Sequence, residues 1–326
     1  MQNPAILICG HGSRDPDAVA EFASMSDKLR QRLPGHAVGH AFLEFARPII
    51  RDGLEALKAT GATRILAQPV MLFAAGHVKN DLPWEINSFA AENPGLAIEY
   101  GRELAVDLKL LAAAKERIAA AEAKAGPKVE RGDTLLLVVG RGTNDPDANS
   151  NVAKVARMLW EGMRFGWTEI AYSGVTSPRV DAALDRAVRL GFRRIIVFPY
   201  FLFTGVLVKR IYDQADAAAA AHPEIEIVKA GYLSDHPLVL DALAERVAEI
   251  SSGGNVMNCL MCKYREQVIG YEADRGAAQA GHHLHVRGIG VDAHHHPHGH
   301  GHDHEHDHDH DHGHDHPHGH HHRPHR

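Results

Sequence analysis

Short apolar runs alternate with amphipathic stretches along the first part of the chain. Ala5–Cys9 is apolar and is followed by Gly10, and the polar residues 13–17 separate it from the amphipathic stretch Ala18–Arg32. A short apolar run bounded by turn residues is typical of a buried strand, whereas apolar positions three or four residues apart predict a helix. Asp15 or Asp17 is expected to cap that helix, because aspartate side chains accept hydrogen bonds from free backbone N–H groups.

The alternation continues to about residue 124. We expect further strands at His36–Leu43, Arg64–Leu72 and Leu96–Tyr100, and helices from Pro48 to Lys58, from the end of a Phe73–Asp81 loop to Ala91, and over Val106–Lys124. Strands that alternate with helices through short loops predict an α/β fold with a parallel sheet covered on both faces. Ligands of such sheets bind beyond the carboxyl ends of the strands. The sequence places His11 and His77 there, each after a predicted strand.

The whole pattern occurs twice. Residues 6–18 read ILICGHGSRDPDA and residues 136–148 read LLVVGRGTNDPDA, an offset of 130 positions. The same offset pairs Pro69 with Pro199 and Gly101 with Gly231 without a gap. A register kept over this length indicates duplication. We therefore predict two homologous domains, 1–126 and 127–254, the first catalytic and the second a degenerate copy.

Composition narrows the class of protein. No apolar stretch is long enough to span a bilayer and the N-terminus has no leader pattern, so a cytoplasmic protein without membrane contact is expected. The net charge of −6 argues against a nucleic-acid partner. Three cysteines form no disulfide framework, which fits a reducing compartment.

The two copies differ at three polar positions. His11 is replaced by Arg141, Glu44 by Gly174, and His77 by Leu207, although the surrounding scaffold positions are kept. A single histidine after a strand is more often a capped or core residue than a catalyst. A purely structural role, however, predicts retention in both copies. The asymmetry therefore favours an active first copy.

The chain resembles the class II chelatases in three motifs: GHGSR (10–14), FLE (42–44) and PVMLFAAGH (69–77). Among these it is most similar to the long sirohydrochlorin cobaltochelatases, the CbiX family, which join two homologous domains and add a C-terminal extension. The resemblance implies a metal chelatase of the lyase class that inserts Co²⁺ into the tetrapyrrole sirohydrochlorin during anaerobic cobalamin (vitamin B12) synthesis. It also implies that no ATP is used, and the sequence has no phosphate-binding P-loop motif.

The residue types suit metal insertion. Neutral imidazole binds Co²⁺ and can also accept a proton, so His11 and His77 are predicted as metal ligands and catalytic groups. Glu44 matches the family's glutamate and is predicted to coordinate the metal or to accept a proton. Because the substrate carries eight carboxylates, polar and cationic side chains should bind it. The candidates by position are Ser13, Arg14, Arg47 and Lys79, each of which could equally be a solvated surface residue.

A CxxC pair, Cys259 and Cys262, lies in the predicted segment 255–281 after a Ser/Gly-rich linker. Two thiolates cannot complete a four-ligand zinc or iron–sulfur site. Other ligands must join, or two chains must contribute two each, which would make a homodimer through this segment. In long members of the resembled family the M-x-C-x-x-C pattern is associated with a [4Fe–4S] cluster. The other interpretation is a pair of reduced surface thiols.

The final segment, 282–326, is rich in histidine, aspartate, glycine and proline and predicts a disordered metal-binding tail. Alternating imidazoles and carboxylates offer many sites for divalent metal ions. We favour storage or delivery of metal over catalysis for this tail. The predicted ligands are His294, His295, His296, His298, His300, His302, His304, His306, His308, His310 and His312.

Four alternatives to cobalt insertion stay open at this point. A sirohydrochlorin ferrochelatase that makes sirohaem, or a nickel-inserting enzyme, would use the same site. A non-catalytic cobalt or nickel storage protein would use the tail, but it would not need paired histidines in one copy. A histidine phosphatase normally has arginine directly before its histidine, whereas here that residue is Gly10.

Overall fold

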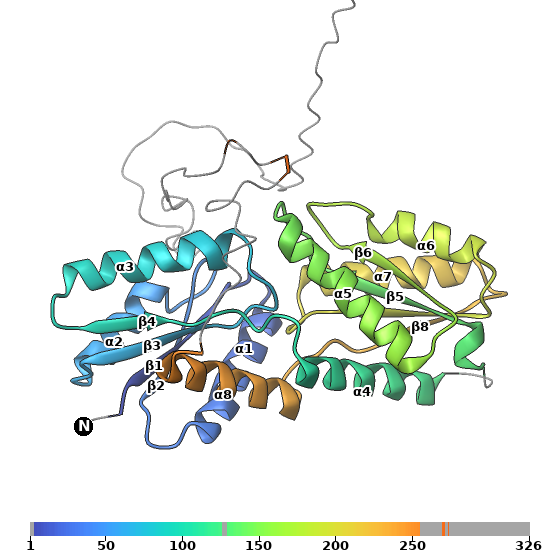
Figure 1. The fold of residues 1–326 in the computed structure, drawn as a ribbon. Helices are drawn as coiled ribbons and strands as arrows, with labels where there is room; N and C mark the ends of the chain where they lie inside the picture. Colours follow the sequence, from blue (N-terminus) through green and yellow to red (C-terminus); the bar gives the residue numbers. More distant parts are fainter. Residues whose placement is uncertain (1–2, 126–128, 255–268, 271–272, 274–326) are drawn as a thin grey trace, which may run out of the picture. The chain divides into compact units, whose positions relative to one another are not determined.

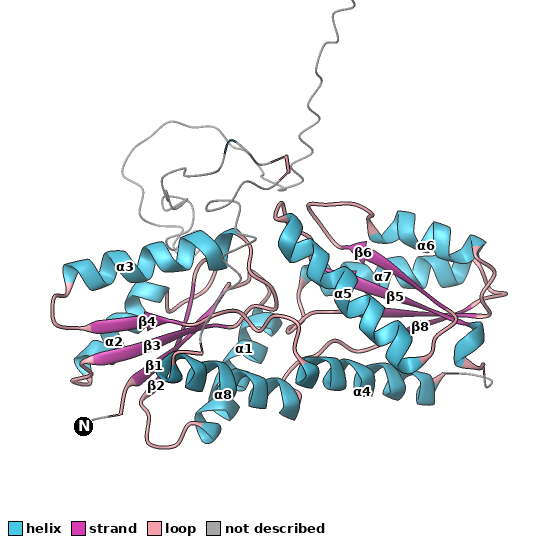
Figure 2. Ribbon diagram, viewed as in Figure 1, coloured by secondary structure: helices cyan, strands magenta, loops and turns pink. Residues whose placement is uncertain are grey.

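The computed structural model describes residues 3–125, 129–254, 269–270 and 273. These residues form two four-stranded parallel sheets, each flanked by helices (Figures 1 and 2). The strand orders are β2-β1-β3-β4 and β6-β5-β7-β8, so the second sheet repeats the topology of the first. The predicted fold class, an α/β protein with two homologous parallel-sheet units, is confirmed.

The first repeat begins with a buried strand and ends with a long helix. Its elements are β1 (Ala5–Gly10), α1 (Pro16–Arg32), β2 (Val38–Phe42), α2 (Ile50–Ala59), β3 (Arg64–Pro69), η1 (His77–Asp81), α3 (Leu82–Glu92), β4 (Ala97–Tyr100) and α4 (Leu108–Lys124). The second repeat follows the same order after a short 3₁₀ turn. Its elements are η2 (Arg131–Asp133), β5 (Thr134–Gly140), α5 (Pro146–Met163), β6 (Trp167–Tyr172), α6 (Val180–Arg189), β7 (Arg194–Pro199), α7 (Val206–Ala221), β8 (Glu226–Lys229) and α8 (Pro237–Ser252).

Every residue of β1 is buried, which explains why the strand reads as a continuous apolar run. Ile6 and Ile8 point to the face covered by α1, and the residues between them, such as Leu7, point to the face covered by α2 and α3. Strand β5 divides its side chains between two faces in the same way. Successive side chains of a strand point to opposite faces, so both faces of each sheet need a helical cover.

The last helices of the two repeats are exchanged. Helix α8, which ends the second repeat, packs against α1 and β3 of the first, whereas α4, which ends the first repeat, packs against α5, β7 and β8 of the second (Figure 1). Arg246 of α8 fixes this arrangement: its buried guanidinium donates to the Leu104 carbonyl at 2.8 Å and pairs with Asp107 at 2.8 Å. Each sheet is therefore covered in part by a helix of the other repeat.

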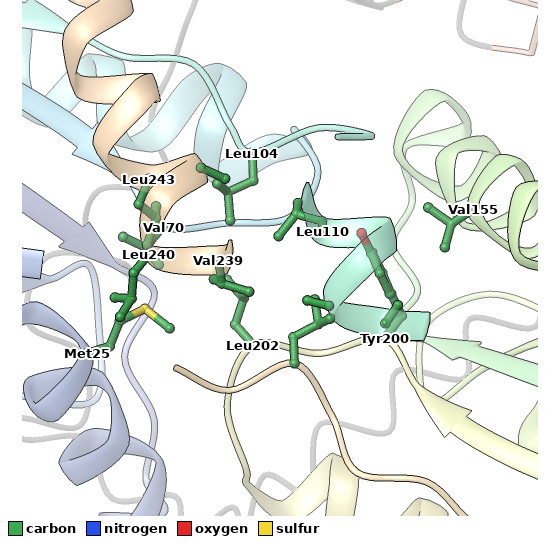
Figure 3. Close-up of a cluster of buried hydrophobic side chains, with 14 of the residues drawn as sticks. Met25, Val70, Leu104, Leu110, Val155, Tyr200, Leu202, Val239, Leu240 and Leu243 are labelled. Carbon is green, nitrogen blue, oxygen red and sulfur yellow. The ribbon is translucent and has the colours of Figure 1, made fainter. Parts of the chain in front are cut away.

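One hydrophobic cluster joins the two repeats because of this exchange. Figure 3 shows Leu240 and Leu243 of α8 lying beside Val70 and Leu104 of the first repeat. Leu110 of α4 extends the same cluster toward the second sheet. Burial of a side chain of this size contributes roughly 1.5–3 kcal/mol, so the shared cluster resists separation of the repeats.

Two ion pairs cross between the repeats in reciprocal fashion. Lys79 Nζ lies 2.7 Å from Asp145 Oδ2, and Lys209 Nζ lies 2.7 Å from Asp15 Oδ2. The two lysines are equivalent in the repeat, and so are the two aspartates, which cap α5 and α1. Residue i contacting j while j contacts i is the signature of a two-fold interface. The chain therefore has an internal pseudo-two-fold axis.

Two local predictions were wrong. Pro48 precedes α2 instead of opening it, because the helix begins at Ile50 with Ile49 as its N-cap. Residues 77–81, expected in a loop, form the π-helical turn η1 that leads into α3. For the helix after β1, the structure chooses Asp15 as the cap; its side chain accepts from the Asp17 N–H at 3.0 Å.

The predicted CxxC segment, apart from residues 269, 270 and 273, and the whole predicted histidine tail lie outside the described residues, and these include Cys259, Cys262 and every tail histidine named above. Their roles, and a homodimer through the CxxC pair, stay predictions. Within the residues that the structure places, no helix combines the length and the apolar character needed to cross a membrane.

Candidate metal-binding site

His11 stands directly after β1, where the strand leaves the sheet. Gly12 follows with φ of 95°, a conformation that L side chains rarely adopt, and a Cβ at this position would lie 1.7 Å from the Glu44 carbonyl oxygen. The Glu44 N–H donates to the His11 carbonyl at 3.0 Å. Glycine at position 12 thus allows the loop after β1 to touch the loop after β2. That contact brings the imidazole of His11 beside the carboxylate of Glu44.

The tautomer of His11 follows from its hydrogen bond. Nδ1 lies 3.0 Å from the Gly12 carbonyl oxygen, which can only accept, so neutral His11 must carry its proton on Nδ1. Nε2 then presents a lone pair, and this buried atom has no hydrogen-bond partner among the described residues. Glu44 Oε1 lies 3.2 Å from Nε2, outside hydrogen-bond geometry. Two electron-rich atoms this close favour a proton or a metal cation between them.

His77 is held by a carboxylate. Its Nδ1 lies 2.8 Å from Asp81 Oδ2, four residues further along the helical turn η1. The Asp81 side chain is only 3% exposed, and its other oxygen accepts from Asn80 Nδ2 at 3.0 Å. A carboxylate on one ring nitrogen fixes the tautomer and increases the basicity of the other. His77 therefore also presents Nε2 as its ligand atom.

The three predicted residues come together. One ligand atom each from His11, Glu44 and His77 lies within 4.8 Å of the others, close enough to share one metal ion. The two imidazole rings meet edge to face with centroids 4.7 Å apart. Two imidazoles and one carboxylate suit Co²⁺, Fe²⁺, Ni²⁺ and Zn²⁺ alike. The geometry thus defines a metal site without choosing among these metals.

Protein surroundings tune the charge of this triad. The pKa of His11 is lowered to about 3, first because burial penalises the imidazolium and second because His77 and Arg141 add positive charge nearby. The pKa of Glu44 is raised by burial, although the charges of His77 and Arg141 oppose the rise. His11 is consequently a neutral ligand at pH 7, and Glu44 is a stronger base than an ordinary carboxylate.

The four predicted substrate-binding residues separate into two groups. Ser13 Oγ accepts from the Asp15 N–H at 3.0 Å, and the Arg14 guanidinium stacks on the Phe45 ring at 4.9 Å, so both lie in or beside the metal-site loops. Arg47 pairs with Asp52 at 3.2 Å on the surface. The Lys79 side chain is only 2% exposed, and its Nζ lies 2.7 Å from Asp145 Oδ2. We assign Lys79 a structural role between the repeats.

Sequence reasoning missed Asp81 and the role of the second repeat at this site. The signal for Asp81 was its position four residues after His77, which places both on one helix face once residues 77–81 are helical. Arg141 was noted only as the residue that replaces His11. In the structure its charge acts on both His11 and Glu44. No signal in one repeat could have placed Arg141 opposite the other.

Comparisons with known proteins agree with this architecture. The CbiX family model matches residues 5–121 and again residues 135–250. A sirohydrochlorin cobaltochelatase of Priestia megaterium is 37% identical over 262 residues, which cover 80% of this chain and 84% of the relative. A sirohydrochlorin ferrochelatase of the same organism is 29% identical over 252 residues, covering 77% of this chain and 92% of the relative.

A solved structure shares the fold. The sirohydrochlorin chelatase SirB from Bacillus subtilis subspecies spizizenii, crystallised in complex with cobalt, superposes with a TM-score of 0.65 at 27% identity. The match covers 77% of this chain and 96% of that chain. The family model covers both repeats and thus well over half of the chain. By its sequence, its duplicated parallel sheets and these relatives, the chain belongs to the CbiX family.

Proposed function

We propose that this protein is an ATP-independent sirohydrochlorin chelatase and that its substrate metal is Co²⁺. The observation that carries the proposal is the triad of His11, Glu44 and His77, whose ligand atoms lie within 4.8 Å of one another. The names of the relatives support sirohydrochlorin as the tetrapyrrole. The second repeat has Arg141, Gly174 and Leu207 in place of the three ligands, which supports a single insertion site, in the first repeat.

Metal capture would use the two imidazoles. Nε2 of His11 has its lone pair free, and Nε2 of His77 is oriented by Asp81. Because the pKa of His11 is lowered to about 3, no proton competes with the metal for this nitrogen at neutral pH. The ion remains exchangeable, since the site offers three protein ligands and leaves positions for water or substrate nitrogen.

Proton removal would fall mainly to Glu44. Insertion of M²⁺ into the macrocycle releases two pyrrole N–H protons, so the site needs a proton acceptor beside the metal. Burial raises the pKa of Glu44 and makes it a better acceptor than a solvated carboxylate. Its main-chain tie to His11 keeps the carboxylate in place during transfer. Protons can then pass to solvent, because the His11 side chain beside it retains 28% exposure.

The choice of cobalt rests on similarity alone. The cobaltochelatase relative is more similar to this chain than the ferrochelatase relative, at 37% against 29% identity. The same triad would accept Fe²⁺ or Ni²⁺. Iron insertion is therefore the second candidate function, favoured by the ferrochelatase relatives.

The decisive experiment is anaerobic metal insertion followed by the visible spectrum of sirohydrochlorin. Co²⁺, Fe²⁺ and Ni²⁺ are offered in turn to the wild type, to His11→Ala and to His77→Ala. We expect Co²⁺ insertion well above the enzyme-free rate, and loss of it in both variants. His222→Ala is the matched control, because His222 lies at the end of α7 and pairs with Glu224 outside the site.

Each outcome separates the candidates. Faster insertion of Fe²⁺ than of Co²⁺ would move the protein to sirohaem synthesis. No acceleration with any metal would refute the enzyme. A chain truncated after Gly281 should keep full insertion activity, whereas a storage protein would lose its metal capacity with the predicted tail.

A further inference from the structure

The second repeat retains the backbone of the metal site but not its ligands. The Gly174 N–H donates to the Arg141 carbonyl at 2.9 Å, which reproduces the bond from Glu44 to His11 at 3.0 Å. Gly142 has φ of 84°, and a Cβ there would lie 2.0 Å from the Gly174 carbonyl oxygen. The same loop geometry therefore presents a guanidinium where the first repeat presents an imidazole. We call Arg141, Val175 and Val206, together with their loops, the second corner.

The reciprocal ion pairs place this corner opposite the triad. Lys79, two residues after His77, holds Asp145, which lies four residues after Arg141. In return, Lys209 holds Asp15, which lies four residues after His11. The loop that carries Arg141 and the loop that carries His11 are thus tied to each other's repeat at short range. The geometry brings a cation of one repeat toward the ligands of the other.

Arg141 has no counter-ion of its own in the part of the chain that the structure describes. Among the described residues it forms no salt bridge within 4.0 Å, and its one hydrogen bond goes to the Gly142 carbonyl at 3.5 Å. Its side chain is exposed, yet its pKa is lowered because nearby protein displaces water, with Glu44 opposing the shift. A guanidinium beside a dication site weakens metal binding by repulsion unless an anion binds between them. An incoming carboxylate would supply that anion, and guanidinium binds carboxylates in bidentate fashion.

Two apolar side chains complete the corner. Val175 is 65% exposed and Val206 is 59% exposed, at the positions equivalent to Phe45 and Gly76 of the first repeat. Val175 also has φ of 63°, a strained conformation for a β-branched residue. Strain of this kind costs of order 1–3 kcal/mol and concentrates at functional sites. A solvent-exposed, strained valine has no packing role in the free chain.

We infer that the second corner docks the macrocycle: Arg141 binds a peripheral carboxylate, and Val175 and Val206 pack against its apolar ring system. This inference rests on the proposed function and gives the degenerate repeat a positioning role in the same reaction. The triad then handles metal and protons, while the opposite repeat holds the anionic tetrapyrrole. Metal binding by itself does not require the second corner.

The first test is Arg141→Gln in the full chain. The probe is metal-free sirohydrochlorin, whose fluorescence reports binding, followed by KM and kcat for insertion. We expect the KM for sirohydrochlorin to rise about ten-fold or more, as for loss of a charged hydrogen bond, whereas the KM for Co²⁺ should stay the same or fall, because a repelling cation beside the triad is removed. Salt should weaken binding less in Arg141→Gln than in the wild type, because one screened attraction is gone. Arg141→Lys should recover part of the affinity.

The matched control is Arg157→Gln, an exposed arginine of α5 that pairs with Glu161 and lies outside the corner. It should retain wild-type KM. If Arg141→Gln also retains wild-type KM while the wild type inserts metal, the inference is overturned and the proposed function stands. If the wild type neither binds nor metallates sirohydrochlorin, the proposed function itself fails.

Val175→Gly supplies an independent second test. Glycine adopts positive φ without strain, so the melting temperature should stay the same or rise. Sirohydrochlorin binding should nevertheless weaken several-fold, because an apolar contact is lost. A merely structural role for Val175 predicts no change in affinity, and that result would refute the apolar half of the inference.

Discussion

The reciprocal ion pairs offer an internal control on the cost of breaking a buried charge pair. Lys79→Met and Lys209→Met remove equivalent lysines that lie at the same 2.7 Å distance from equivalent aspartates. The surroundings differ: the Lys79 side chain is 2% exposed and that of Lys209 is 52% exposed. We predict that Lys79→Met is strongly destabilising and that Lys209→Met is not.

The magnitude for Lys79→Met follows from what it leaves behind. The Asp145 carboxylate is 3% exposed, and without Lys79 its Oδ2 loses its ammonium partner. Removing one member of a buried pair costs about 3–5 kcal/mol. The lower end applies here, because Asp145 Oδ1 still accepts from the N–H groups of Asp147 and Ala148. A loss of about 3 kcal/mol is a large part of a typical unfolding free energy.

Urea unfolding followed by circular dichroism and by tryptophan fluorescence measures the effect. With a slope of about 3 kcal/mol per molar urea, the midpoint for Lys79→Met should fall by about 1 M. Lys209→Met should lower the midpoint much less, because Lys209 is half exposed and water can replace its ammonium beside Asp15. Lys79→Met combined with Asp145→Asn should recover part of the loss, since asparagine still caps α5. Equal midpoints for the two single variants would refute the reasoning.

Three further predictions concern other residues. Asp81→Asn should lower metal-insertion activity about 10–100-fold with an unchanged melting temperature, because it replaces the carboxylate that orients His77 with a neutral amide. Unchanged activity in the insertion assay would contradict this prediction. Gly12→Ala should abolish insertion, since its Cβ would meet the Glu44 carbonyl at 1.7 Å, and wild-type rates would show that the loop contact is dispensable. Glu103→Gln should raise the melting temperature at pH 8 but not at pH 4. An equal rise in melting temperature at both pH values would contradict this prediction. Burial raises the pKa of Glu103, so the folded state favours the protonated acid and loses stability as pH rises through that pKa.

The local structure was predictable wherever the chain's own pattern determines it. β1 begins at Ala5 as predicted and extends one residue further, to Gly10, and the cap of α1 is one of the two aspartates expected. The register of the repeat predicted that the second sheet would copy the first. It also identified His11, Glu44 and His77 as the residues that differ, and the structure brings these three together.

What escaped prediction depends on contacts between the repeats. Nothing in the amphipathic pattern of α4 or α8 says which sheet each helix covers, because both sheets offer similar apolar faces. Likewise, Lys79 reads as a surface cation until Asp145 of the other repeat is placed beside it. The helical turn at His77 was missed because no residue at its start caps it with a side chain, so the sequence has no helix-start signal there.

The exchange of α4 and α8 also bears on how an unequal pair of repeats can exist. In an assembly of two identical chains, every substitution appears on both sides of the two-fold axis, so a histidine could not become arginine in one corner alone. Joining the copies in one polypeptide removes that constraint and holds them at high effective concentration. The exchanged helices α4 and α8 would keep the two repeats associated even if the peptide link between α4 and β5 were cut. Fusion is therefore needed less for assembly than for asymmetry. The second repeat can change its side chains while the first repeat keeps the metal ligands.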